Sequence, residues 1–166
     1  MKITKEHFYH GAVLNQIAEH KQFTAINALK VNGKTSRSAF KVNDDIAVYL
    51  KYASEPTEAY EEYIFTFAKH HLAELRKIND AENSLHLALV CVQDNEVCCF
   101  PYSKLVQLIT KRKQEFGKPE QQYTLLVTLK KGEAFRVNMN EPGKKKAYLG
   151  KPLTVRRNAC PNALFR

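Results

Sequence analysis

The sequence predicts one domain of the α/β (α+β) class, built on a mixed central sheet flanked by helices. Three observations support this prediction. The 166 residues, 44% of them hydrophobic, are enough for one sizeable core but not for two. Apolar runs of strand length alternate with segments of helical periodicity. No internal repeat and no linker divides the chain, so we expect a single domain over residues 1–166.

The first hundred residues alternate between helical and extended patterns. Thr4 is a typical N-cap, and His10, Val13 and Ile17 follow at helical spacing, which predicts a helix over 5–20. Residues 23–29 are expected to be a second, short helical or irregular stretch. The further expected elements are a hairpin of strands 38–42 and 46–53, a strand 60–67, a helix 68–78, and a hairpin of strands 85–92 and 97–100. We expect strand 60–67 to lie beside strand 46–53 in one sheet.

The run Leu85 to Val92 is almost continuously apolar, which is typical of a central strand covered on both faces. After it we expect a helix over 102–116, ended by Gly117, and then strands 123–129 and 134–139. A loop rich in lysine and glycine leads to a short strand 153–155. Residues 5–100 would thus form a core, and residues 101–166 a basic helix with a C-terminal β extension.

The charge is distributed unevenly between these two parts. Residues 1–100 carry 11 Lys and Arg against 13 Asp and Glu, a net charge of −2, whereas residues 101–166 carry 15 against 4, a net charge of +11. A soluble domain usually mixes its signs, so this asymmetry indicates a surface that binds a polyanion. Charge alone does not separate RNA, DNA and an anionic membrane surface.

The cysteines and the N-terminus indicate a cytoplasmic protein. No apolar targeting segment follows Met1, and no run approaches the roughly 18 apolar residues of a membrane span. Cys98 and Cys99 are adjacent in an expected strand, so they point to opposite faces and cannot chelate one ion together. We expect these two, Cys91 and Cys160 to be buried, reduced thiols.

The element order over residues 5–100 resembles the core of the restriction-endonuclease-like, or PD-(D/E)XK, nuclease superfamily, in which a helix, a three-stranded meander, a second helix and a fourth strand follow one another. The resemblance implies a metal-binding Asp at the start of the second strand and a Glu-x-Lys on the third. The carboxylates would hold Mg²⁺ against the scissile phosphate, and the lysine would assist the attacking hydroxide.

On this chain the resemblance implies Asp45 and Glu62 as ligands of Mg²⁺, Lys51 as the lysine and Glu19 as the acidic residue of the first helix. The chain departs from the family pattern, because no lysine follows Glu62 by two residues. The nearest string, Tyr49-Leu50-Lys51, has a tyrosine where the acid belongs. Either the site is assembled from migrated residues, or the domain is a nuclease-like scaffold without its metal.

Each of these residues also has a simpler interpretation. Asp44 and Asp45 are typical of a hairpin turn, Lys51 of an exposed strand face, and Glu62 of a strand that begins after a loop. His7 and His10 lie one helical turn apart but lack a third ligand, so they are expected to pack and to form hydrogen bonds at the helix end rather than to bind a metal. His70 and His71 are adjacent in a helix and diverge by about 100°, so they are not expected to share a metal.

The C-terminal cations give the main functional prediction. Lysine and arginine side chains bind nucleic acid by displacing counterions from its phosphates. Arg136, Asn138 and Asn140 stand at every second position and so share one strand face, where they could read bases. A disordered tail is the alternative, although interleaved apolar residues indicate a segment tied to the core. The expected nucleic-acid-binding residues are Lys144, Lys145, Lys146, Lys151, Arg156, Arg157, Arg136 and Asn138.

The sequence therefore predicts a nucleic-acid-binding protein whose partner is duplex DNA, and which acts as a magnesium-dependent endonuclease of restriction or homing type. A homodimer is compatible with this function. Two alternatives stay open, a DNA- or RNA-binding module without catalysis and a basic adaptor that docks on an acidic protein. No Gly-rich phosphate loop, nucleophile elbow or HExxH motif is present to indicate another enzyme class.

Overall fold

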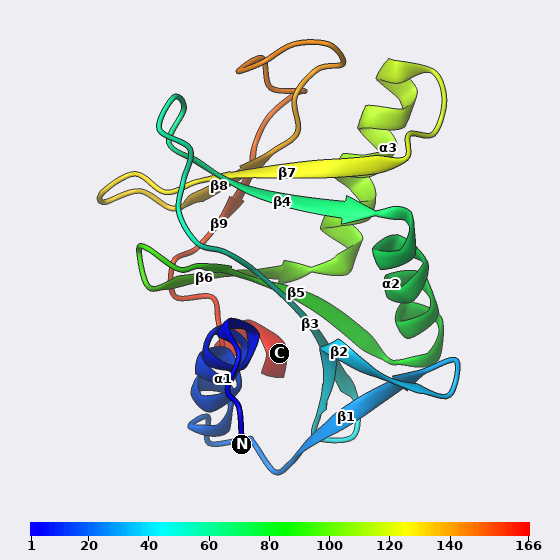
Figure 1. Ribbon diagram of the computed structural model, residues 1–166, viewed down its shortest axis with the longest axis vertical. Coiled ribbons are helices and arrows are strands. Elements are labelled where there is room, and N and C mark those ends of the chain that lie inside the picture. Colours follow the sequence, from blue (N-terminus) through cyan, green and yellow to red (C-terminus); the bar gives the residue numbers. More distant parts are fainter.

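The computed structural model describes all residues from Met1 to Arg166 and has an α+β fold with two β-sheets and three α-helices (Figure 1). The helices are α1 (Lys5–Ala18), α2 (Lys69–Ala81) and α3 (Tyr102–Phe116), and a 3-10 helix, η1 (Asn162–Phe165), ends the chain. The strands are β1 (Ile26–Val31), β2 (Lys34–Val42), β3 (Ile46–Ala53), β4 (Glu62–Ala68), β5 (Ser84–Cys91), β6 (Glu96–Pro101), β7 (Gln122–Thr128), β8 (Phe135–Asn138) and β9 (Leu153–Val155).

The larger sheet is mixed and has five strands in the order β1-β2-β3-β5-β6. All its neighbours are antiparallel except β3 and β5, which run parallel with Ile46 opposite Ser84 and Ala53 opposite Cys91. A parallel pair needs a long crossover, and β4 with α2 supplies it. As predicted from its apolar run, β5 lies inside the sheet, and six of its eight residues are buried.

The smaller sheet is antiparallel, with the order β4-β7-β8-β9. Residues 60–67 are thus correctly predicted as a strand, but the expectation that this strand lies beside residues 46–53 in one sheet is wrong. Strand β4 pairs with β7 instead, and Phe65 is opposite Leu125. The C-terminal strands do not extend the first sheet, since together with β4 they form a second one.

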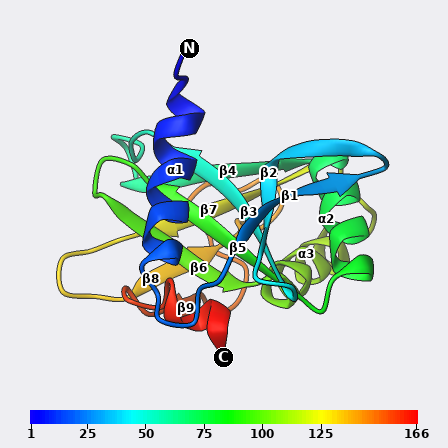
Figure 2. The same ribbon diagram turned by 90° about the horizontal axis from the view of Figure 1, so that it is seen from below.

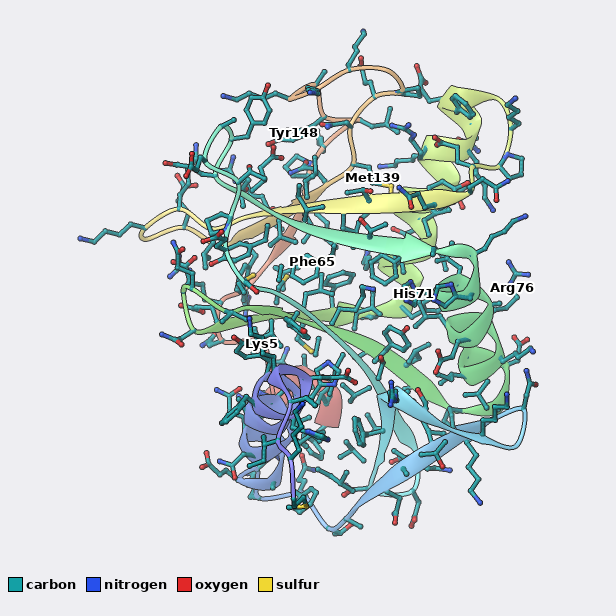
Figure 3. The ribbon with its side chains drawn as sticks, in the orientation of Figure 1. Lys5, Phe65, His71, Arg76, Met139 and Tyr148 are labelled. Atoms are coloured by element: carbon teal, nitrogen blue, oxygen red, sulfur yellow. The ribbon has the colours of Figure 1, made fainter.

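The five-stranded sheet is the middle layer of the molecule, with an apolar core on each face. Phe65 and Phe67 of β4 fill the larger core, between the two sheets, as Figure 3 shows for Phe65. The smaller core lies beneath α1, where Val13 and Ile17 pack against this sheet's other face. Cys98 belongs to the larger core and Cys99 to the smaller, which confirms that the adjacent thiols point to opposite faces.

Helix α1 crosses the outer face of the five-stranded sheet, close to the C-terminal η1 (Figure 2). Its start is capped reciprocally, because Thr4 accepts the backbone N–H of His7 while the His7 ring accepts that of Thr4. Helices α2 and α3 lie along one side of both sheets (Figure 1). No helix is both long and apolar enough to cross a membrane.

One predicted element has a different structure. Residues 23–29 were expected to be helical or irregular, but Ile26 to Val31 form the edge strand β1. Only Leu29 of this edge strand is buried. A strand with so little burial does not need apolar residues at every second position, so its sequence carries no period-two pattern that would indicate a strand.

Candidate nucleic-acid interface

Helix α3 presents two lysines on one face. Lys104 and Lys111 are seven residues apart, which is close to two helical turns, so both side chains lie on the same side of the helix. Together with Lys151 they line a shallow hollow of about 210 Å³ beside β9. The Nζ atom of Lys111 lies within 3.8 Å of where a Cβ on Gly150 would stand, so α3 and the loop before β9 meet here.

A second hollow, of about 270 Å³, shares Lys104 with the first and adds Arg156 and Arg166 from the chain after β9. Neither hollow is lined by an aspartate or a glutamate, and none of these five cations forms an ion pair. We call Lys104, Lys111, Lys151 and Arg156 the basic face. Cations that line hollows without acidic side chains create a local positive potential that favours a polyanion.

Several of the cations predicted from the sequence are engaged within the protein. Lys144 forms an ion pair of 2.7 Å with Glu141, and Arg136 one of 3.7 Å with Glu133. Arg157 donates hydrogen bonds to the backbone oxygens of Lys130 and Glu133 and to the Glu96 carboxylate. Arg157 thus ties the chain after β9 to two other turns of the molecule.

The other predicted binding residues differ in their exposure. Lys145, Lys146, Lys151 and Arg156 are exposed, and the ammonium of Lys146 lies 5.4 Å from the centre of the Tyr60 ring. Asn138 was expected to read bases together with Arg136, but it is only 3% exposed. The loop that follows β8 covers this part of the sheet, so Asn138 does not reach the surface.

The two carboxylates expected to hold Mg²⁺ lie far apart. Asp45 is exposed in the turn that precedes β3. The next residue, Ile46, is opposite Ser84, the first residue of β5, so Asp45 lies near the start of β5. Glu62 precedes Tyr63, whose hydroxyl is hydrogen-bonded to Asp94, beyond the other end of β5. The eight residues of β5 span roughly 25 Å. One Mg²⁺ needs its oxygen ligands at about 2.1 Å, so this structure does not assemble the site from Asp45 and Glu62.

The other two catalytic candidates also lie in separate places. Glu19 caps the C-terminus of α1 and accepts a hydrogen bond of 3.4 Å from Asn15, on the outer side of the five-stranded sheet. Lys51 lies on the opposite side, between the sheets, with its ammonium 5.1 Å from the centre of the Phe67 ring. Nowhere do three or more His, Cys, Asp or Glu side chains form a group that could hold a metal ion.

Lys51 lies near His71, a residue of the first turn of α2 (Figure 3), and both side chains are partly buried. Burial lowers the pKa of Lys51. The pKa of His71 falls to about 4 because of burial first and then because of the positive charges of Lys51 and His70. Its Nδ1 accepts the backbone N–H of Ala68, so His71 is a neutral helix-capping residue near neutral pH.

A polar pocket of about 510 Å³ between β2 and α2 was missed by the sequence analysis. Ser36 lines it and accepts the backbone N–H groups of Ser38 and Ala39, while its hydroxyl donates to Glu74 of α2. Tyr49, which is 1% exposed, also lines it, and burial raises its pKa together with the charge of Glu74. These residues come together only through the packing of α2 on β2, so no pattern of neighbouring residues in the sequence predicts the pocket.

The lysines of α3 could have been found from the sequence, because a seven-residue spacing within a predicted helix places two side chains on one face.

In comparisons with known proteins, no family model, no curated protein and no solved structure matches this chain.

Proposed function

We propose that this protein binds nucleic acid through the basic face, with the lysines and the arginine in contact with backbone phosphates. The observation that supports this most directly is the pair of adjoining hollows, lined by the four cations of the basic face and Arg166 and by no aspartate or glutamate side chain. Lys and Arg side chains that neutralise phosphates release condensed counterions, which gives affinity without sequence readout. Such contacts position a nucleic acid, whereas base contacts specify it.

The charges around the basic face favour nucleic acid over the other polyanions. The cations come from α3, the loop before β9 and the chain after β9, and these elements set the spacing of the backbone that carries them. An array of cations on one face can follow the regularly spaced phosphates of a nucleic acid. An acidic protein partner would be expected to offer apolar anchors as well, yet Leu108 and Leu153, the apolar residues between these cations, are largely covered.

A nuclease-like scaffold is the second candidate, and the strand order favours it. Helix α1, the meander β1–β2–β3, helix α2 and strand β5 follow the order of the restriction-endonuclease-like core, with all four strands in one sheet, if β4 is taken as an insertion between β3 and α2 that joins the other sheet. In this alignment the third strand is β3, which carries Tyr49-Leu50-Lys51. Lys51 would then occupy the position of the family's lysine, and Tyr49 would replace the family's acidic residue. The strand order therefore supports a nuclease-like scaffold in which Asp45 and Glu62 do not form the metal site.

Fluorescence anisotropy with a labelled DNA duplex tests the binding proposal at a series of salt concentrations. Affinity that falls steeply with salt, and a shallower slope after removal of the basic-face lysines, is the expected outcome. Absence of binding at low salt would overturn the proposal. Incubation of the same duplex with Mg²⁺ tests the second candidate, because a nuclease would cut it.

A further inference from the structure

A hollow of about 500 Å³ lies on the outer face of the four-stranded sheet, beneath the loop after β8. We call it the outer pocket. Its floor includes Ile64 of β4 with Thr124 and Leu126 of β7, which alternate with core residues and so face away from the core. Arg112, which follows Lys111 of the basic face, forms part of its wall. The pocket therefore opens next to the surface proposed to bind phosphates.

The floor of the outer pocket offers an apolar surface. Ile64 is 47% exposed although it lies within a strand, and it is opposite Leu126 in the sheet. Binding pockets commonly combine such an apolar surface with a few polar groups that orient the ligand. A flat molecule can lie against Ile64 and Leu126 while its edge reaches the polar wall.

Two asparagine amides beside this floor have unused hydrogen-bonding capacity. Asn138 pairs with Leu126 across the strands, and Asn140 is two residues further on the same side. The Oδ1 atoms of both are buried and have no hydrogen-bond partner. Buried polar atoms are nearly always paired. Asn140 lines the pocket, so rotation of its amide would turn Oδ1 toward a ligand that donates an N–H.

The wall of the outer pocket is held rigidly. Arg112 donates from Nε and Nη2 to both oxygens of Glu120, at 2.6 and 2.9 Å, and from Nη1 to the backbone oxygen of Asn140 at 2.6 Å. The hydroxyl of Tyr123 accepts the backbone N–H of Glu120. This network fixes the backbone of Asn140 before any ligand arrives, so that only its side-chain amide has to turn, which lowers the entropic cost of binding.

The mouth of the outer pocket carries one cation that is free to meet an anion. Lys144 is paired with Glu141, but the neighbouring Lys145 is exposed and forms no ion pair. A ligand with a planar donor edge and a nearby phosphate would place the edge at Asn140 and the phosphate at Lys145. A nucleotide has these two parts. Adenine, cytosine and guanine donate from amino groups, and an unpaired thymine donates from its ring N3–H.

We propose that the outer pocket receives one unpaired nucleobase, with an N–H of its pairing edge at Asn140 and its phosphate beside Lys145. This inference rests on the proposed nucleic-acid binding when the base belongs to a strand. A free nucleotide offers the same chemistry. The protein would then hold a strand by its backbone on the basic face and prefer strands in which a base can leave its pair.

Short labelled single strands of oligo(dA), the same strand with unsubstituted purine in place of adenine, a duplex, and AMP are the probes. Purine lacks the amino group of adenine and has no other N–H on its pairing edge. We expect oligo(dA) to bind about tenfold more tightly than the purine strand, which corresponds to one amino-group hydrogen bond. The Asn140→Leu protein should bind both single strands alike, while its affinity for the duplex stays unchanged. Equal binding of the two strands by the wild type would overturn the proposal, and so would a preference retained by Asn140→Leu.

A second variant covers the case in which Asn140→Leu does not fold. Ile64 is largely exposed, so Ile64→Glu keeps the sheet intact and places a negative charge under the base. It should weaken oligo(dA) binding about tenfold and leave the duplex unaffected; unchanged oligo(dA) binding would contradict the inference. If no nucleic acid binds but AMP does, in a manner that Asn140→Leu abolishes, the pocket takes a free nucleotide and the basic face fails. If neither binds, both proposals are wrong.

Discussion

The phenolic hydroxyl of Tyr148 donates a hydrogen bond of 2.8 Å to Oε2 of Glu62, across 86 residues of sequence. Glu62 begins β4 and is 3% exposed, while Tyr148 lies in the loop over the outer face of the four-stranded sheet (Figure 3). A β-bridge from Tyr148 to Asn140 holds the same loop. The lysine-rich segment is thus tied to the core, and the alternative of a disordered tail does not apply to it.

Replacing Tyr148 with Phe should destabilise the protein by about 1–3 kcal/mol, because the buried carboxylate of Glu62 loses its donor. Urea unfolding at neutral pH measures the change. Tyr60→Phe is a matched control, since Tyr60 is exposed and its hydroxyl has no hydrogen-bond partner. If both variants lose equal stability, the contact with Glu62 is not the cause.

Acid should weaken the fold through His71. Its pKa lies at about 4, below the ordinary value of 6.5, so between these two values the unfolded chain takes up a proton that the folded chain does not. The contribution of His71 is complete above pH 6.5 and is lost as the pH falls toward 4. Burial of His10 and His86 also lowers their pKa values and acts in the same direction.

The His71→Gln protein should therefore lose less stability than the wild type across this pH range. Glutamine can still accept the backbone N–H of Ala68, which separates the effect of titration from the loss of the cap. Lys51→Met should also reduce the acid loss, because the positive charge of Lys51 lowers the pKa of His71. Denaturant unfolding at several pH values measures both effects, and parallel curves for all three proteins would contradict this origin of acid sensitivity.

Ser36→Ala should cost about 1–3 kcal/mol of unfolding free energy. The hydroxyl of Ser36 accepts two backbone N–H groups of β2 and donates to Glu74, so its removal leaves partly buried groups unpaired. Thermal unfolding compares it with Ser103→Ala, which changes an exposed serine of α3. A difference below about 0.5 kcal/mol between the two variants would mean that Ser36 does not link β2 to α2 energetically.

The basic face has a quantitative salt signature. With four phosphate contacts, the affinity for duplex DNA should fall roughly 150-fold between about 50 and 200 mM salt. The triple variant Lys104→Ala, Lys111→Ala and Lys151→Ala should reduce the slope of log K against log salt by about 2.7. Replacing Lys2, Lys30 and Lys69, which are exposed and unpaired, removes the same charge elsewhere. An equal change of slope in both triple variants would show that binding does not depend on the basic face.

Most elements of this fold could be predicted locally, but their partners could not. The apolar run of β5 and the helical spacing in α3 identify each element, because burial imposes a period on the side chains. Nothing local says that β4 pairs with β7, since Phe65 and Leu125 are 60 residues apart and meet only after two helices and two strands have intervened. The sequence therefore predicted the strand and assigned it to the wrong sheet.

The same limit applies to the candidate sites. A basic C-terminal part is visible from composition, and two of its predicted binding residues, Lys151 and Arg156, are exposed. Which cations stay unpaired depends on where the glutamates fold, so the sequence indicates Lys144 and Arg157 without revealing their partners Glu141 and Glu96. The polar pocket at Ser36 and the outer pocket at Asn140 exist only through packing of distant segments.

The pairing of β4 with β7 has a consequence during synthesis of the chain. When the ribosome has released β4, its only partner strand has not yet been made, so Tyr63, Phe65 and Phe67 have no sheet to join. The five-stranded sheet can form earlier, because its last strand ends at Pro101. A nascent intermediate would expose this aromatic row until residue 128 emerges, and exposed strands of this kind invite aggregation or chaperone binding.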